Sequence, residues 1–313
     1  MNPRLILGGL KSYLPARLSA YTGTGGTTTG AYCHSVFMRH MSIIGRHVRP
    51  FRPDVVVELG PGDSIGLGLA ALLAGARTYH GLDVLEHASV QTNERVLGEL
   101  VELFRSRAPL ADESVFPRLL PPLPDYRYPT GLLDEKVLEE RLSESSVRRL
   151  QEALKDMRAK GSPIHYSCPW TARSVEPRSA DLVISQVALQ DMDHIPSRDD
   201  LRDNIETMAG WLKPGGVMSH QIDFSCPGGT PWNHHWAYGS LSWKLVRGKR
   251  PYFKNRVPLS EYLRLFDAAG CNVVGVEPTF ADGLPRGQLA APFRNLPEDD
   301  LRTRAALVVA VKR

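Results

Sequence analysis

A glycine-rich turn is the part of this chain whose residue types and spacing best suit ligand chemistry. Three valines at residues 55–57 are followed by Glu58, Gly60 and Gly62. A run of β-branched residues predicts a buried strand. Glycines directly after a strand let the backbone turn tightly and approach a ligand without a Cβ atom in the way. A strand, a glycine turn and an apolar helix in this order are typical of loops that hold a nucleotide.

The residues around the two glycines favour S-adenosylmethionine over a dinucleotide. A dinucleotide fingerprint needs a third glycine three residues after Gly62, where this chain has Ile65. It also rarely has an acid where this chain has Glu58, because the acid would repel the negative pyrophosphate. The cationic methionine end of S-adenosylmethionine can instead be approached by an acid and by backbone amides. The chain also lacks a Tyr-x-x-x-Lys dyad for hydride transfer, which disfavours an NAD-dependent oxidoreductase.

Three further segments extend this pattern along the chain. Residues 78–82 predict a second strand that ends at Asp83, about 20 residues beyond the glycines, where a carboxylate can accept hydrogen bonds from ribose hydroxyls. Residues 180–186 predict another buried strand. Residues 211–216 predict the end of a helix and a Pro-Gly turn that leads into a strand at 217–220. Strands and helices in this order predict an open α/β sheet.

With these motifs the chain resembles the class I S-adenosylmethionine-dependent methyltransferases. The matching segments are ELGPG, GLD, ADLVIS and LKPGG, and the resemblance covers residues 54–224. It implies a Rossmann-like, doubly wound, mostly parallel seven-stranded sheet with a helical insertion or cap. It also implies an enzyme that transfers a methyl group from S-adenosylmethionine. We place the predicted cofactor contacts at Glu58, Gly60, Pro61, Gly62, Asp83, Val84, Ser185 and Gln186.

Three other segments, residues 32–40, 220–224 and 232–238, resemble a bacterial subgroup of this family. Members of the subgroup are often found among polysaccharide-biosynthesis enzymes, which favours a sugar hydroxyl of a glycan or glycolipid precursor as the methyl acceptor. O- or N-methylation of a small-molecule secondary metabolite is the alternative within the same chemistry. A catalytically inactive, nucleotide-binding regulatory protein is the alternative of another class. The joint presence of Glu58, Asp83 and the glycines argues against that last reading.

A methylated hydroxyl needs a base on the acceptor side of the site. Methyl transfer from a sulfonium is an in-line displacement, in which the acceptor lone pair must lie about 3 Å from the methyl group. Ligands of open α/β sheets bind at the carboxyl ends of the strands, so the base should follow the fourth or fifth strand. A histidine oriented by a carboxylate suits this task. The predicted catalytic residues are His220, Asp223, His234 and His235, with a purely structural histidine as the alternative at each histidine position.

Metal ligands are not predicted from the sequence. Asp191, Asp193 and His194 follow the fourth strand, but their spacing is not a recognised ligand pattern. Related sequences commonly carry a Glu-His pair where this chain has Gln190 and Asp191. The four cysteines are scattered without a CxxC pair and are expected to be reduced thiols.

The first 53 residues are predicted to form a helical lid over the site. Residues 22–30 read as a flexible glycine and threonine loop, and residues 31–48 as a helix. A lid that closes over the cofactor would exclude water and hold the acceptor in place. Tyr32 or His34 would then reach the pocket. A mobile leader without a role is the alternative.

Residues 54–313 are predicted to form the methyltransferase domain, with two departures from a minimal core. Residues 84–163 are read as a helical insertion beside the active site. Residues 224–257 are read as a loop that determines substrate specificity. The remaining predicted elements are helices at 93–106 and 259–269, one or two charged amphipathic helices within 134–160, a strand at 164–166, and a closing antiparallel hairpin of 271–276 and 305–311.

Composition bounds the partners and the location. The 313 residues are 42% hydrophobic, enough for one large core. The N-terminus does not resemble a signal peptide and no apolar stretch reaches membrane-spanning length, so a cytoplasmic protein is expected. The net charge is +4, and six basic residues with interleaved aromatics between Lys244 and Arg256 predict a clamp for an anionic acceptor or a lipid surface, with a solvated loop as the alternative.

The predicted partner is therefore a small-molecule or glycan acceptor, anionic or lipid-linked, with at most peripheral membrane contact. A nucleic-acid partner is not predicted, because no RNA-binding or helix-turn-helix signature accompanies the basic residues.

Overall fold

A single seven-stranded sheet organises the computed structural model, which describes residues 3–13, 26–193, 199–226, 230–250 and 253–313. The strand order is β3-β2-β1-β4-β5-β7-β6, with β1 to β5 mutually parallel and β7 antiparallel to both of its neighbours. This arrangement confirms the predicted fold class. The strands are β1 (Val55–Leu59), β2 (Thr78–Leu82), β3 (Ile164–Ser167), β4 (Ala180–Gln186), β5 (Leu212–Asp223), β6 (Cys271–Phe280) and β7 (Thr303–Lys312).

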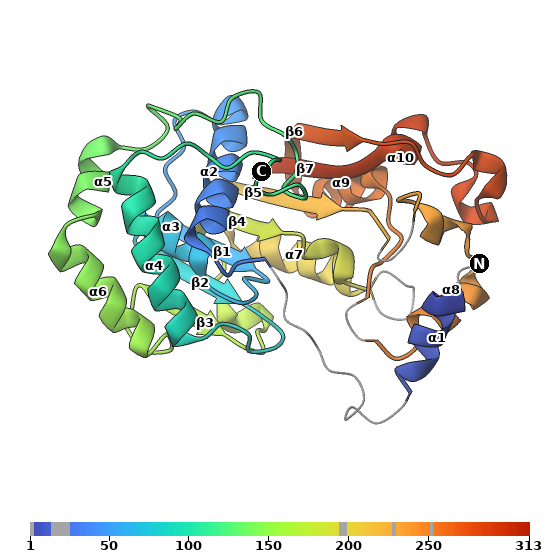
Figure 1. Ribbon diagram of the computed structural model, residues 1–313, viewed down its shortest axis with the longest axis horizontal. Coiled ribbons are helices and arrows are strands. Elements are labelled where there is room, and N and C mark those ends of the chain that lie inside the picture. The colour runs from blue at the N-terminus through green and yellow to red at the C-terminus, as the bar shows by residue number, and fades with distance from the viewer. Residues whose placement is uncertain (1–2, 14–25, 194–198, 227–229, 251–252) are drawn as a thin grey trace.

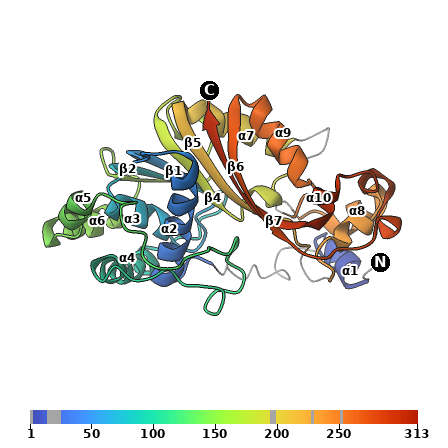
Figure 2. The same ribbon diagram turned by 90° about the horizontal axis from the view of Figure 1, so that it is seen from above.

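Helices cover both faces of the sheet, as Figures 1 and 2 show. Among the described residues, five α-helices contribute to the hydrophobic cluster on one face, and two helices of ten or more residues contribute to the cluster on the other face. The first group is α2 (Gly30–His47), α3 (Gly66–Leu73), α4 (Val90–Arg105), α5 (Glu135–Arg141) and α6 (Glu144–Lys155), and the second is α7 (Asp200–Trp211) and α9 (Leu259–Ala268). A further helix, α10 (Glu298–Arg302), precedes β7.

The alternation of side chains in the central strands explains why those strands read as continuous apolar runs. Val56 packs into the cluster with α2 and α3, whereas Val57 packs into the cluster with α7 and α9. A strand buried on both faces needs apolar residues at successive positions. The three successive valines of β1 therefore reflect the burial of this strand on both of its faces.

Two predicted strand boundaries differ from the structure by several residues. β5 begins at Leu212 rather than at Val217, and its pairing with β4 shifts register between Ala180 and Leu182. The predicted Pro-Gly turn thus lies within the strand as an irregularity, with Gly215 at φ +79°. The closing hairpin is also longer than predicted, because β6 continues to Phe280.

A separate small unit lies at one end of the molecule (Figures 1 and 2). It consists of α1 (Pro3–Lys11) and α8 (Ser240–Arg247), which pack against each other. Its small core contains Tyr238, Trp243, Val246 and Phe253. Because α8 belongs to the predicted specificity loop, part of that loop folds with the start of the chain.

The fully buried helix α3 depends on a glycine. All eight of its residues are buried, and a Cβ atom at Gly68 would lie 2.3 Å from atoms of the Tyr79 ring. The Tyr79 ring thus fills the space that a side chain at position 68 would need.

Replacement of this glycine should separate packing from helix propensity. Gly68→Ala is expected to lower the free energy of unfolding by about 1–3 kcal/mol, because the added methyl group overpacks the core. Gly98→Ala is the matched control, since Gly98 is exposed in α4 and a Cβ atom there would meet nothing within 4 Å, and it should raise stability by about 0.5–1 kcal/mol. Urea denaturation of both variants measures the difference, and equal effects would contradict the packing role.

Candidate functional site

The glycine turn lies at the carboxyl end of β1, where the strand order reverses toward β4. Gly60 and Gly62 have φ values of +72° and +74°, a backbone region that favours glycine. The amide of Gly60 donates to the carbonyl of Leu82 at 2.8 Å, which fixes the turn against the end of β2. A Cβ atom at Gly60 would lie 3.1 Å from the Cβ atom of Ala188, beyond the end of β4. The loops after β1 and β4 therefore face each other across the switch point.

Asp83 joins the end of β2 to this turn. One carboxylate oxygen accepts from the amide of Gly62 at 3.2 Å, and the other accepts from the amide of Val84 at 2.8 Å. Burial raises the pKa of Asp83, while these amide hydrogen bonds oppose the increase. Each carboxylate oxygen has a second lone pair, so the group can still accept hydrogen bonds from ligand hydroxyls.

Glu58 lies beneath the turn. Its side chain accepts a hydrogen bond from the hydroxyl of Tyr79 at 2.6 Å and is fully buried. Burial raises the pKa of Glu58 to about 8, so the group is largely protonated at neutral pH. Glu58 thus connects β1 to the Tyr79 ring, on which Gly68 of α3 packs. Its predicted contact with the cofactor remains a prediction.

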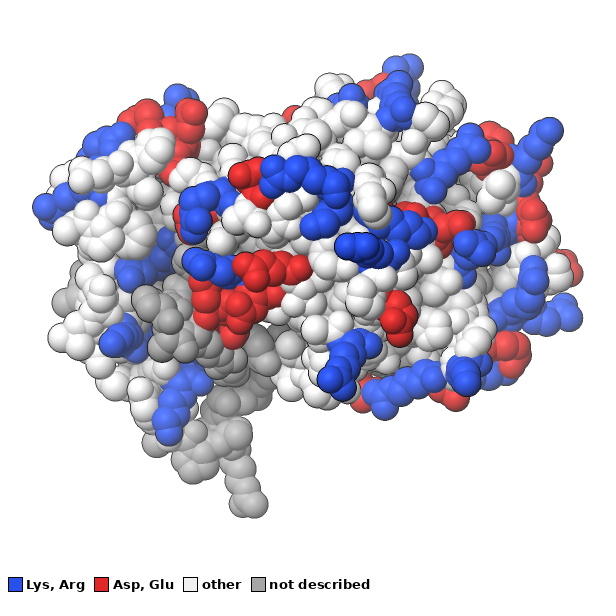
Figure 3. Space-filling model, turned by 180° about the vertical axis from the view of Figure 1, so that it is seen from behind, with Lys and Arg blue, Asp and Glu red and all other residues white. Residues whose placement is uncertain are grey.

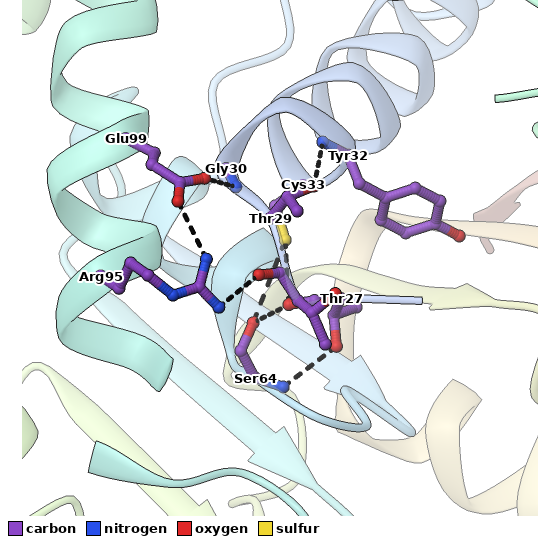
Figure 4. A network of polar contacts seen from close by, with 9 residues as sticks. Thr27, Thr29, Gly30, Tyr32, Cys33, Ser64, Arg95 and Glu99 are labelled. Atoms are coloured by element: carbon purple, nitrogen blue, oxygen red, sulfur yellow. Dashed lines mark hydrogen bonds and ion pairs between the residues drawn. The ribbon is translucent and has the colours of Figure 1, made fainter. Parts of the chain in front are cut away.

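The N-terminal segment clamps the glycine turn, as Figure 4 shows. The hydroxyl of Thr27 donates to the carbonyl of Pro61 at 2.8 Å and accepts from the amide of Ser64 at 3.0 Å. The hydroxyl of Ser64 donates back to the carbonyl of Thr27. Three hydrogen bonds thus join one residue before α2 to the loop after β1.

Helix α4 holds the same segment from the other side (Figure 4). Arg95 donates to the carbonyl of Thr28 at 2.7 Å and forms an ion pair with Glu99 at 2.9 Å. The second carboxylate oxygen of Glu99 accepts from the amide of Gly30 at 2.6 Å, at the first turn of α2. The part of the predicted loop at 22–25 lies outside the described residues.

Of the two residues predicted to reach the pocket from α2, Tyr32 lies near the site. It interacts with Gln186 at the end of β4, and burial raises its pKa to about 12. Its ring packs edge to face on Phe116 of the insertion, with 5.3 Å between centroids. His34 instead packs on Phe104 of α4, and burial lowers its pKa to about 4.

A buried polar layer joins α2 to β4 and β5. One ring nitrogen of His40 is 2.7 Å from the hydroxyl of Ser219, and the other is 3.2 Å from the amide oxygen of Gln186. The amide nitrogen of Gln186 donates to the side chain of Gln221 at 3.4 Å. Burial lowers the pKa of His40 to about 4, so the ring is neutral at pH 7. Sequence reasoning missed His40, although a histidine among the apolar residues of the predicted helix was its signal.

Arg39, the neighbour of His40, is a buried cation. Its side chain is almost inaccessible, and its guanidinium lies 5.8 Å from the centroid of the Tyr126 ring. Within the described part of the chain it forms no ion pair with a carboxylate. Burial lowers its pKa, and its charge in turn lowers the pKa of the adjacent Tyr32.

The structure does not bring the predicted histidines and their carboxylate together. The ring of His220 stacks on Phe266 of α9, and one of its ring nitrogens is 2.8 Å from the hydroxyl of Ser185 in β4. Burial lowers the pKa of His220 to about 3. Within the described ranges, no hydrogen bond or ion pair joins Asp223 to His220, His234 or His235.

His234 and His235 lie in a short 3₁₀ helix after β5, among aromatic rings. The ring of His235 is buried between Trp236 and Trp243, with centroid distances of 5.5 and 6.0 Å. Burial lowers its pKa well below the usual value. His234 packs edge to face on Tyr238.

Asp223 instead belongs to a charged cluster at the ends of β4 and β5. Lys254 lies 3.4 Å from the carboxylate of Asp223 and also donates to its backbone carbonyl. Asp191 carries the second carboxylate of the cluster, and its side chain accepts from Gln190 at 3.2 Å. Asn255 fixes the segment around Asp191, because the backbone amide of Asn255 donates to the backbone carbonyl of Gln190 at 2.6 Å.

The electrostatics of Asp191 suit proton transfer near neutral pH. Burial raises its pKa to about 6, while the cation of Lys254 opposes that increase and the neighbouring Asp223 adds to it. The group is therefore mostly ionised at pH 7, yet it can accept a proton. Asp191 is also partly exposed, whereas His220 and His235 are fully buried.

Neither a metal site nor a membrane span is found among the residues that the structure describes. Those residues contain no group of three or more His, Cys, Asp or Glu side chains placed to hold a metal ion. They also contain no helix with both the length and the apolar character needed to cross a bilayer. His194, one of the residues considered as a ligand, lies outside the described ranges.

No family model and no curated protein matches the chain. Among solved structures, it is similar to an S-adenosylmethionine-dependent methyltransferase from Mesorhizobium loti, at 15% identity over 87% of this chain and 96% of that one, with a TM-score of 0.40. It is also similar to 1,6-didemethyltoxoflavin-N1-methyltransferase from Burkholderia thailandensis, at 12% identity over 89% and 79%, with a TM-score of 0.43.

A third similar structure is phosphoethanolamine N-methyltransferase 2 from Haemonchus contortus, at 14% identity over 95% of this chain and 59% of that one, with a TM-score of 0.42. Similarity at this level does not transfer an activity or a substrate.

The clamp on the glycine turn can be tested at one hydroxyl group. Thr27→Val keeps the shape of the side chain but leaves the carbonyl of Pro61 and the amide of Ser64 without this partner. The free energy of unfolding should fall by about 1–3 kcal/mol. Thr28→Val is the matched control, because the Thr28 side chain is exposed, and it should change stability little. Chemical denaturation compares the two, and an unchanged Thr27→Val variant would show that the clamp does not stabilise the fold.

Proposed function

We propose that the chain is a methyltransferase that uses S-adenosylmethionine. The observation that carries the proposal is the turn at Gly60 and Gly62, held by the Asp83 carboxylate at the point where the strand order reverses. Residues without Cβ atoms leave room for close approach of a ligand, and an acid at the end of β2 is placed to accept from ribose hydroxyls. When bound, S-adenosylmethionine supplies an electrophilic methyl group on a sulfonium.

The residues around the glycine turn fit this cofactor. The turn offers backbone groups and no basic side chain, which suits a ligand without phosphates. Thr27 and Tyr32 approach the same region from the N-terminal segment, so that this segment forms part of the wall of the site. The proposed lid keeps its predicted bounds of 1–53, and its support comes from residues 26–47, since α1 packs against α8 instead.

For the acceptor side, we propose that Asp191 takes the proton of a hydroxyl group. The carboxylate lies beyond the end of β4, where ligands of open α/β sheets bind. The cation of Lys254 keeps Asp191 ionised near neutral pH, and Asp223 holds Lys254 beside it. His220, His234 and His235 remain the rival candidates for the base.

The proposed acceptor is a sugar hydroxyl of a glycan or glycolipid precursor. Support comes from the resemblance of residues 32–40, 220–224 and 232–238 to the polysaccharide-associated subgroup. A small-molecule secondary metabolite is the alternative acceptor.

Cofactor binding can be tested without knowledge of the acceptor. Calorimetry should show micromolar binding of S-adenosylhomocysteine to the wild type and at least a tenfold weaker affinity for Asp83→Ala, because the ribose loses its acceptor. Glu86→Ala is the matched control, since Glu86 is an exposed acid near Asp83 in the chain, and it should bind normally. NADH should not bind. Absence of S-adenosylhomocysteine binding, or equal affinity of both variants, would contradict the proposed site.

The base can be tested with Asp191→Asn and His235→Gln. Asp191→Asn should lower kcat by about 10²–10⁴-fold, because a general base contributes that much, and should leave S-adenosylhomocysteine binding intact. In the wild type, kcat should fall as the pH drops below about 6, since the raised pKa of Asp191 then protonates the base. Turnover is measured as S-adenosylhomocysteine release with the first sugar of an acceptor panel that supports it.

A large loss of kcat in His235→Gln with a normal Asp191→Asn would transfer the role to the histidine. Tight binding of S-adenosylhomocysteine with no turnover on any acceptor would instead favour the inactive regulatory protein.

A further inference from the structure

Two stretches of the chain contain no acidic residue. Residues 1–53 carry seven Lys and Arg, and residues 224–260 carry six, but neither stretch has an Asp or a Glu, although the chain has 34 of them. The two stretches are far apart in sequence. Their positive charge is therefore not balanced by neighbours in the sequence. The fold pairs Arg247 with Asp193 and Lys254 with Asp223, whereas Lys244 and Lys249 are exposed.

The fold brings the beginning of the first stretch and part of the second stretch together in the unit formed by α1 and α8. A Cβ atom at Gly9 would lie 1.9 Å from the carbonyl oxygen of Leu245, so the helices touch backbone to backbone. The amide of Lys249 donates to the hydroxyl of Ser12 at 2.7 Å. Leu5 and Ile6 pack on the aromatic core of the unit, which anchors the inner face of α1.

The outer faces of the two helices carry the same pattern of leucine and lysine. In α1, Leu7, Leu10 and Lys11 are exposed at positions i, i+3 and i+4. In α8, exposed residues with the same spacing are Leu241, Lys244 and Leu245. Residues with this spacing lie on one face of a helix.

The exposure of these leucines is large. Leu241 is 77% exposed, and Leu7, Leu10 and Leu245 are 46–53% exposed. At the end of the contact, Tyr13 is 58% exposed and lies under the ammonium group of Lys249, 5.2 Å from its ring centroid. In Figure 3, the lower left corner, which corresponds to the end of the molecule that holds α1 and α8 in Figure 1, shows Lys and Arg but no Asp or Glu. Apolar and basic side chains thus share one surface.

We infer that the surface of α1 and α8 docks peripherally on an anionic lipid bilayer. Interfacial helices insert leucines between acyl chains while lysines contact anionic headgroups, and an aromatic residue such as Tyr13 suits the boundary between them. Charge complementarity selects the bilayer, because the surface is basic and the cytoplasmic leaflet is anionic. The inference does not depend on the proposed reaction.

Binding to lipid vesicles tests the inference on the full chain. Vesicles of phosphatidylcholine with phosphatidylglycerol should sediment the protein at low salt, whereas vesicles of phosphatidylcholine alone should bind at least tenfold less. Binding to the anionic vesicles should weaken as salt increases, because exposed charges are screened. Equal binding to both kinds of vesicle, or no binding to either, would overturn the inference.

Two variants separate the apolar from the electrostatic contribution. The double variant Leu241→Ser with Leu245→Ser should weaken binding at least tenfold. The triple variant Lys11→Gln with Lys244→Gln and Lys249→Gln should also weaken binding at least tenfold, because each cation near an anionic surface contributes about a fivefold factor in affinity. The matched controls are Val115→Ser, which is 58% exposed elsewhere, and the triple replacement of the exposed Arg118, Lys136 and Lys160 by Gln.

Both controls should sediment like the wild type. Thermal melting verifies that each variant is folded. Controls that lose as much binding as the test variants would show nonspecific attraction by net charge and would overturn the assignment to α1 and α8.

Discussion

Parallel pairing of β1 with β4 is the constraint on which the site depends. β1 pairs with β2 on one side and with β4 on the other. The chain leaves β1 toward α3 on one face of the sheet and leaves β4 toward α7 on the opposite face. The two loops therefore diverge and leave an open edge between them. The positive φ values at Gly60 and Gly62 let the first loop turn back over this edge without strain.

Polar groups buried within the central strands make the position of α2 specific. Ser219 and Gln186 would each carry an unsatisfied hydrogen-bonding group if α2 lay elsewhere, because both depend on His40. An unpaired buried polar group costs about 1–3 kcal/mol, whereas an apolar contact tolerates a shift along the helix. The N-terminal helix is thus held in one register over the sheet, and that register places Thr27 and Tyr32 beside the glycine turn.

The sequence was informative wherever the signal was local. The valine run, the glycines and Asp83 predicted β1, its turn and the end of β2, because periodicity and backbone freedom act between neighbours in the chain. The catalytic prediction depended on contacts between distant segments, which spacing alone does not determine. Alternation along β5 turns His220 toward α9, while Asp223 meets Lys254 from a segment 31 residues further on. The Thr27 clamp was likewise invisible, since its partners lie at positions 61 and 64.

The polar layer under α2 has a consequence for the order in which the molecule is assembled. His40 is synthesised before its partners Gln186 and Ser219, which follow 146 and 179 residues later. Contacts of such sequence separation slow folding, because the chain must close a long loop before they stabilise anything. The contacts of α2 with α3 and α4 can form as soon as those helices are made, whereas its polar layer stays incomplete until β5 has left the ribosome. Until then the buried polar group of His40 lacks its partners, which leaves the position of α2 over the sheet open to misassembly.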